Sequence, residues 1–91
     1  MITPFERGAL VATPAALDAC EAANVSPSAL LERHAAGDWG EVSAADAREN
    51  ELSVREGFRV VSSYSLSTGA KVWVITEADR SSTCLLLPSE Y

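Results

Sequence analysis

The sequence lacks the features that identify membrane proteins, secreted proteins and disulfide-stabilised domains. No apolar run approaches the roughly 20 residues that a helix needs to span a bilayer, and the N-terminal residues contain no basic region followed by an apolar core. The two cysteines, Cys20 and Cys84, are far apart and form no CxxC motif. We therefore expect a cytoplasmic protein with reduced cysteines and no membrane partner.

Basic residues are scarce. Thirteen acidic residues against seven basic ones give a net charge of −6, which disfavours nonspecific contact with DNA, RNA or anionic lipid. Six acidic and two basic residues lie between Asp38 and Glu56, so two-thirds of the net charge is local. This pattern is typical of a solvated helix face, and a basic or neutral protein partner fits the charge best.

Catalytic signatures are also missing. The chain has one histidine, no GxSxG or HExxH motif and no phosphate-binding glycine loop. Two carboxylates in one loop without a histidine make a poor metal site. The residues alone specify no activity, and we expect no cofactor and no bound metal.

The composition fits one small globular domain. A chain of 91 residues, 47% hydrophobic and 22% charged, is large enough to fold around a modest core. No repeat, linker or low-complexity tract interrupts it. We predict a single domain over residues 1–91.

Three helices are predicted in the first half of the chain from capping residues and glycine stops. Threonine or serine precedes proline at Thr13 and Ser26, and Ser43 stands three residues before Asp46, as in a capping box. Glycines follow the second and third segments. The predicted helices cover residues 14–24, 27–36 and 43–56.

The second half favours β-strands. After Gly57 the chain is rich in Val, Tyr, Trp, Ile and Thr, and a glycine-bearing turn separates the first two strands. The predicted strands are Phe58–Leu66, Lys71–Thr76 and Thr83–Leu87, with Phe5–Ala12 as a candidate fourth. The predicted fold class is α+β, with two or three N-terminal helices packed on a three- to four-stranded antiparallel sheet.

His34 is the only candidate for imidazole chemistry. A general-base hypothesis would combine it with Asp38, four residues later, and with Glu77 or Asp79 brought close by folding. Gly37 is expected to end the helix before Asp38, which breaks the i,i+4 geometry. A structural or surface histidine is the favoured interpretation.

Two turns are candidates for recognition. Trp39 lies between Gly37 and Gly40, where its indole either closes the core or serves as a partly exposed anchor, since tryptophan is enriched in binding hot spots. The segment Glu77–Ser82 places Asp79 and Arg80 between two apolar strands. It forms either a charged binding lip or a loop fixed by a salt bridge.

A family resemblance covers nearly the whole chain and is strongest from Arg33 onward. It is carried by Arg33-His34, Gly37-Asp38-Trp39-Gly40, Asn50, the run from Trp73 to Ser81, and Leu86-Leu87-Pro88. The chain resembles short proteins found on bacterial plasmids, integrative elements and phages, often called plasmid-related proteins. Some carry a label that ties them to type I restriction-modification. The resemblance implies an accessory role in a mobile element and no particular chemistry.

Three hypotheses follow for the function. The first is a non-enzymatic accessory protein that binds a host or element-encoded protein, with a host defence component among the candidates; its contact residues would be Trp39, Asp79 and Arg80, flanked by His34, Asp38 and Glu77. The second is a small enzyme or nucleotide-binding protein using His34 and the Glu77–Ser82 loop. The third is a DNA-binding regulator, because the first two helices have helix-turn-helix spacing, although the acidic charge opposes it. An exposed edge strand would also allow a homodimer.

Overall fold

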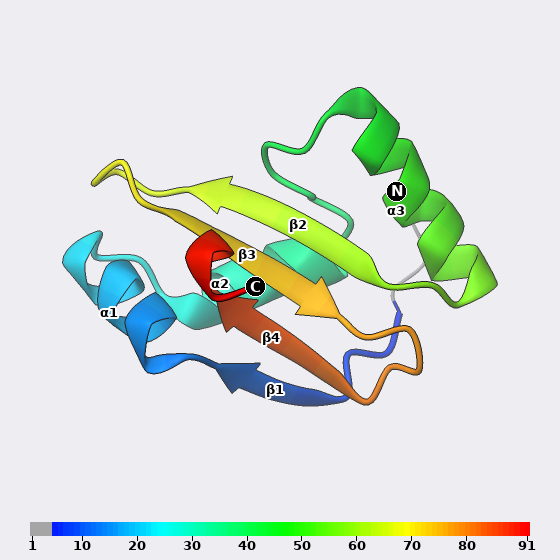
Figure 1. The fold of residues 1–91 in the computed structure, drawn as a ribbon, viewed down its shortest axis with the longest axis horizontal. Coiled ribbons are helices and arrows are strands. Elements are labelled where there is room, and N and C mark those ends of the chain that lie inside the picture. Colours follow the sequence, from blue (N-terminus) through cyan, green and yellow to red (C-terminus); the bar gives the residue numbers. More distant parts are fainter. Residues whose placement is uncertain (1–4) are drawn as a thin grey trace.

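The computed structural model describes residues 5–91, so the first four residues of the predicted domain lie outside the described part. The elements follow one another as β1 (Ala9–Ala12), α1 (Pro14–Ala22), α2 (Pro27–Ala35), α3 (Ala44–Glu56), β2 (Val60–Ser65), β3 (Lys71–Thr76), β4 (Ser82–Leu86) and a 3₁₀ turn, η1 (Pro88–Glu90) (Figure 1). The three helices precede three of the four strands. The α+β class is confirmed.

The helix boundaries follow from local side-chain caps. The Thr13 hydroxyl accepts a hydrogen bond from the Ala16 N–H at 3.1 Å, and the Ser43 hydroxyl accepts one from the Asp46 N–H at 3.1 Å. Gly57 ends α3 in the left-handed region, at φ 81°, which glycine adopts without steric cost. The predicted starts and stops agree with the structure to within two residues.

The sheet is mixed, which corrects the prediction of a purely antiparallel sheet. Its strand order is β1-β4-β3-β2, with β2, β3 and β4 antiparallel and β1 parallel to β4. Three helices and two strands separate β1 from β4 along the chain. The direction in which two such distant segments meet depends on the path between them, and hydrophobic alternation within β1 carries no information about it.

The core lies between one face of the sheet and helices α1 and α2. Cys20 of α1 and Leu30 of α2 pack with Tyr64, Val74 and Leu85 of the sheet, and all five are at most 3% exposed. Figure 1 shows α2 crossing behind the sheet. Burial of this apolar face is the main stabilising contribution expected for so small a domain.

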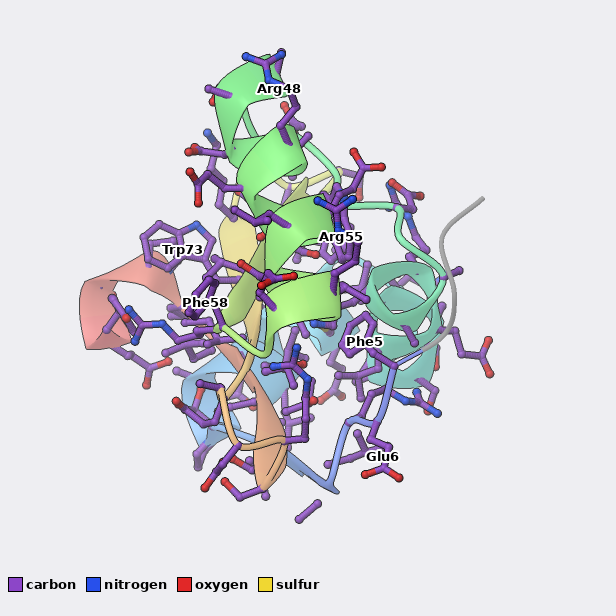
Figure 2. The ribbon with its side chains drawn as sticks, turned by 90° about the vertical axis from the view of Figure 1, so that its right-hand side faces the viewer. Phe5, Glu6, Arg48, Arg55, Phe58 and Trp73 are labelled. Carbon is purple, nitrogen blue, oxygen red and sulfur yellow. The ribbon has the colours of Figure 1, made fainter. Side chains whose placement is uncertain are left out.

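The opposite face of the sheet, which we call the outer face, is covered less completely. Trp73 lies on it, and its ring stands 5.7 Å from the Tyr91 ring next to η1. Figure 2 shows Trp73 and Phe58 on the side of η1 and Phe5 on the side of α2. Helix α3 borders the outer face beside β2 (Figure 1).

None of the helices between residues 5 and 91 has the length and apolar character needed to cross a membrane.

Candidate functional site

The two turns singled out by the sequence meet around Phe5. The Phe5 ring lies 5.5 Å from the His34 ring and 6.3 Å from Trp39, and His34 and Trp39 are 5.8 Å apart. The guanidinium of Arg80 stands 5.6 Å above the Phe5 ring, within the range of a cation–π contact. The structure therefore brings His34, Trp39 and Arg80 together around Phe5, which belongs to the segment of residues 5–8 that precedes β1 and that we call the N-terminal arm.

His34 is the centre of a buried chain of hydrogen bonds. Its Nδ1 lies 2.6 Å from the Ser62 hydroxyl, and its Nε2 lies 2.8 Å from the Thr76 hydroxyl. Thr76 is 2.7 Å from the Thr83 hydroxyl, which donates to the carbonyl oxygen of Arg7 at 2.7 Å. His34, Ser62, Thr76 and Thr83 are all fully buried.

The direction of every bond in this chain follows from counting protons. A hydroxyl has one proton to donate, and Thr83 uses its proton on the Arg7 carbonyl, so Thr76 must donate to Thr83. The Thr76 oxygen then accepts the Nε2–H of His34, which leaves Nδ1 to accept from Ser62. The geometry assigns His34 to the neutral Nε2–H tautomer.

Burial and charge both keep His34 neutral. Desolvation, followed by the positive charges of Arg7 and Arg80, lowers its pKa to about 4. Both ring nitrogens are occupied and the side chain has no exposed surface. A general base must reach the proton that it removes, and a saturated, enclosed imidazole does not reach a substrate.

Trp39 has the position of a core-closing residue. It is 6% exposed, and its carbonyl oxygen accepts a hydrogen bond from Ser63 at 3.0 Å. This burial matches the first of the two interpretations offered for its indole. Trp39 holds the chain against the edge of β2, and its ring is not on the surface in this conformation.

Arg80 fixes the loop between β3 and β4 through backbone oxygens. Its guanidinium donates to the carbonyls of Phe58, Glu77 and Ala78, at 2.7, 3.0 and 3.3 Å, and to that of Ser53 at 2.9 Å. Within residues 5–91 it forms no ion pair with a carboxylate, so one of the two alternatives for this loop, fixation by a salt bridge, is corrected to fixation by carbonyl contacts. Arg80 also meets the carboxyl end of α3, where a cation is favourable.

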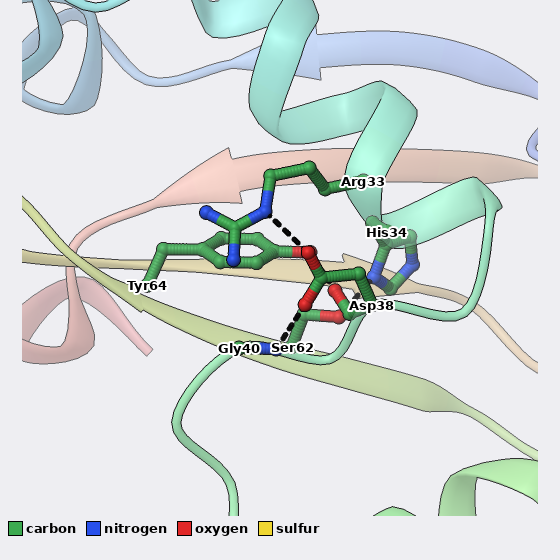
Figure 3. A network of polar contacts seen from close by, with 6 residues as sticks. All are labelled: Arg33, His34, Asp38, Gly40, Ser62 and Tyr64. Carbon is green, nitrogen blue, oxygen red and sulfur yellow. Dashed lines mark hydrogen bonds and ion pairs between the residues drawn. The ribbon is translucent and has the colours of Figure 1, made fainter.

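The Asp38 carboxylate lies outside the buried cluster and fixes the turn after α2. It pairs with Arg33 at 2.6 Å and accepts from the Gly40 N–H at 3.2 Å, and the contact with Arg33 is the main cause of its lowered pKa. Figure 3 shows the Arg33 guanidinium over the Tyr64 ring, 4.5 Å from its centre. The Tyr64 hydroxyl donates to the Asp38 carbonyl at 2.6 Å, and burial raises the pKa of Tyr64 to about 12.

Glu77 and Asp79 are exposed at the tip of the β3–β4 loop. The Asp79 carboxylate accepts from the Ser81 N–H at 2.9 Å, and hydrogen bonding to Ser81 lowers its pKa. The Glu77 N–H donates to the Ser82 carbonyl at 3.0 Å. Both carboxylates face solvent, and within residues 5–91 no group of three histidine, cysteine or acidic side chains is placed to hold a metal ion.

A second site, missed from the sequence, lies on the outer face beside α3. Two adjoining hollows of about 470 and 410 Å³ share Val42, Asp46 and Val61; we call them together the outer groove. Acidic residues of the lining come from α3 and the loop before it, and the basic residues come from the position before β2 (Arg59) and the start of β3 (Lys71); apolar residues complete the lining. The residues that line it include Glu41, Val42, Asp46, Glu49, Phe58, Arg59, Val61, Lys71 and Trp73.

One signal in the sequence pointed towards this surface. In Lys71–Thr76, the residues at 72 and 74 are valine while Trp73 and Ile75 occupy the alternate positions. Side chains alternate between the two faces of a strand, so β3 is apolar on both faces. A strand of this kind has neighbours on each side of the sheet, and here the outer neighbours are η1 and the outer groove.

Comparison of the chain with family models, with curated proteins and with solved structures gives no match.

Proposed function

We propose that this protein is a non-enzymatic binding module that holds a segment of a partner protein in the outer groove. The observation that carries the proposal is the composition of the groove. Val42, Val61, Trp73 and the 55% exposed Phe58 supply apolar surface in a lining that also carries acidic and basic side chains. Aromatic residues surrounded by a polar rim are the usual anatomy of a protein-binding surface.

The charge of the groove selects the chemistry of the partner. Glu41, Asp46 and Glu49 form its acidic wall, and the whole chain carries a net charge of −6. A segment with apolar residues flanked by lysine or arginine complements this wall, and the long-range attraction speeds its association. Arg59 lines one hollow and Lys71 the other, and either can pair with an acidic residue in the same segment.

The contacts among Phe5, His34, Trp39 and Arg80 support this assignment because they tie separate segments of the chain together. The residues first considered for contact, His34, Trp39 and Arg80, lock the arm, α2 and the β3–β4 loop together, while Asp38, Glu77 and Asp79 remain at the periphery. Preformed surfaces bind with a smaller ordering cost. The resemblance to plasmid and phage proteins adds the proposal that the partner is a host or element-encoded protein, with a defence component as one candidate.

The test uses the fluorescence of Trp73 as the reporter of binding. Peptides selected from a random library against the full chain should be basic and apolar, and their titration should change the emission of Trp73 in a Trp39→Phe background. Glu49→Lys should weaken binding about fivefold, close to 1 kcal/mol, whereas Glu51→Lys, a matched charge change outside the groove lining, should change it less than about twofold. Selected peptides whose affinity is unchanged by Glu49→Lys, and which leave Trp73 emission unchanged, would overturn the proposal.

A further inference from the structure

The two edges of the sheet differ in whether their outward backbone N–H and carbonyl groups have hydrogen-bond partners. At the β2 edge, the Asn50 side chain donates to the Val61 carbonyl at 2.7 Å and accepts from its N–H at 3.1 Å. The Ser63 N–H and carbonyl are bonded to Trp39 and Glu41 at 3.0 and 2.7 Å. These contacts satisfy the outward backbone groups at two successive positions and prevent another strand from pairing there.

The β1 edge has no such cover among the described residues. The N–H groups of Ala9 and Thr13 point towards β4, donating to Ser81 and Leu85 at 3.1 and 3.0 Å. Alternation along the strand therefore turns the N–H and carbonyl groups of Leu10 and Ala12 away from the sheet. Among residues 5–91, no other strand lies beyond β1 in this sheet (Figure 1).

The composition of β1 does not protect this edge. Natural proteins blunt exposed edges with lysine, proline or a bulge, and the strand Ala-Leu-Val-Ala contains none of these. Leu10 is 49% exposed and Val11 47% exposed, and Leu17 of the following helix is 44% exposed. Three of the five exposed large apolar side chains among residues 5–91 thus come from β1 and α1.

We propose that a second copy of this chain pairs with β1 in an antiparallel register, with Leu10 opposite Ala12 of the second copy and Val11 opposite its own equivalent. This register is symmetric about Val11 and satisfies the outward N–H and carbonyl groups of both Leu10 and Ala12 through four hydrogen bonds. A second copy presents the same uncharged strand with the same exposed Leu10 and Val11. Self-pairing therefore sets apolar side chains against apolar side chains and brings no like charges together within the strands, although the net charge of −6 on each copy opposes association at longer range.

The symmetry has a functional consequence that rests on the proposed binding function. A twofold axis through the Val11 pair is perpendicular to the sheet, so it keeps the outer faces of both copies on the same side of one continuous sheet. The outer grooves beside each α3 then point in the same direction at opposite ends of the dimer. Two segments of one partner, or two copies of it, would bind with the higher overall affinity of a bivalent contact.

Val11 allows the interface to be tested without disturbing the monomer, because its side chain is half exposed and carries no side-chain hydrogen bond. Sedimentation equilibrium of the full chain over a concentration series should give a dimer for the natural sequence and for Val11→Thr, which keeps a neutral β-branched residue. Val11→Lys should raise the dimer dissociation constant at least about tenfold, because it places two ammonium groups directly opposite each other.

Cross-linking checks the register. In a Cys84→Ser background, Val11→Cys should form an intermolecular disulfide on mild oxidation, since residues opposite in a non-hydrogen-bonded pair have Cα atoms about 4.5 Å apart. Leu10→Cys should link poorly, because its equivalents are diagonal neighbours about 7–8 Å apart. A monomer at every concentration, or a dimer that resists Val11→Lys and shows no Val11→Cys link, would overturn the inference. Two variants separate this inference from the proposed function. Val11→Lys should be monomeric and still bind peptide, and Glu49→Lys should be dimeric and bind peptide weakly.

Discussion

Replacing Thr76 with valine tests the assignment of hydrogens around His34. Valine has nearly the same shape as threonine, so the change removes one hydroxyl from a fully buried position and leaves the packing in place. The His34 Nε2–H, now 2.8 Å from the hydroxyl oxygen, loses the one acceptor that residues 5–91 offer it. Thr83 loses a donor but retains its own bond to the Arg7 carbonyl.

The expected cost follows from these two losses. Leaving a buried donor unsatisfied costs about 1–3 kcal/mol, and the gain in apolar character at the same position offsets a small part of that. We expect Thr76→Val to reduce the free energy of unfolding by about 2 kcal/mol, which lowers Tm by roughly 10 °C in a domain of this size. Thr68→Val, the same change at an exposed turn position, should alter stability by less than about 0.5 kcal/mol.

Urea unfolding followed by circular dichroism measures the loss, and long-range nitrogen–proton NMR spectra identify the tautomer of His34. The costs of Thr76→Val and Thr83→Val should not add, because both remove the same bond, and a double-mutant cycle should give a coupling of at least about 0.5 kcal/mol. A Thr76→Val variant as stable as the Thr68→Val control, or a His34 proton found on Nδ1, would refute the reasoning.

Three further predictions concern pH, the β2 edge and the N-terminal arm. Because the pKa of His34 is lowered from 6.5 to about 4 in the folded protein, the unfolded chain binds its proton first as pH falls. The free energy of unfolding should therefore fall as the pH is lowered from about 6.5 to 4, and His34 should have no effect on it above that range. In urea unfolding series recorded at each pH, His34→Gln should abolish this fall. Asn50→Ala removes two hydrogen bonds to Val61 while gaining helix propensity, so we expect the free energy of unfolding to fall by about 1–1.5 kcal/mol. Hydrogen exchange of the Val61 amide should become faster, and an unchanged exchange rate would show that Asn50 does not cover the edge. Gly8 has φ +65°, and a Cβ at this position would overlap the carbonyl oxygen of Arg80. Gly8→Ala should therefore accelerate hydrogen exchange of the Ala9 amide, which donates to Ser81. A wild-type exchange rate would mean that residues 5–8 pack differently.

The candidate site could be predicted only in part. That the turn around Trp39 and the loop around Arg80 lie near each other was a hypothesis from the sequence, and the structure places them around Phe5. The full burial of His34 and the use of Arg80 on carbonyl oxygens were not predictable, because each depends on atoms supplied by β2, β3 and the carboxyl end of α3. The outer groove was missed for the same reason, since its lining comes from four separate segments of the chain, residues 41–53, 58–63, 71–73 and Pro88.

The sequence by itself determined the class of the fold and the limits of most elements. Thr13 and Ser43 as caps, Gly57 as a stop, and the alternation in Lys71–Thr76 act within a few residues, so their meaning does not depend on distant contacts. Only the tertiary structure decided that β1 runs parallel to β4, that one edge of the sheet is capped while the other is open, and which face of β3 carries a groove. These outcomes are set by how segments separated by up to seventy or so residues meet, and local propensity contains no information about such meetings.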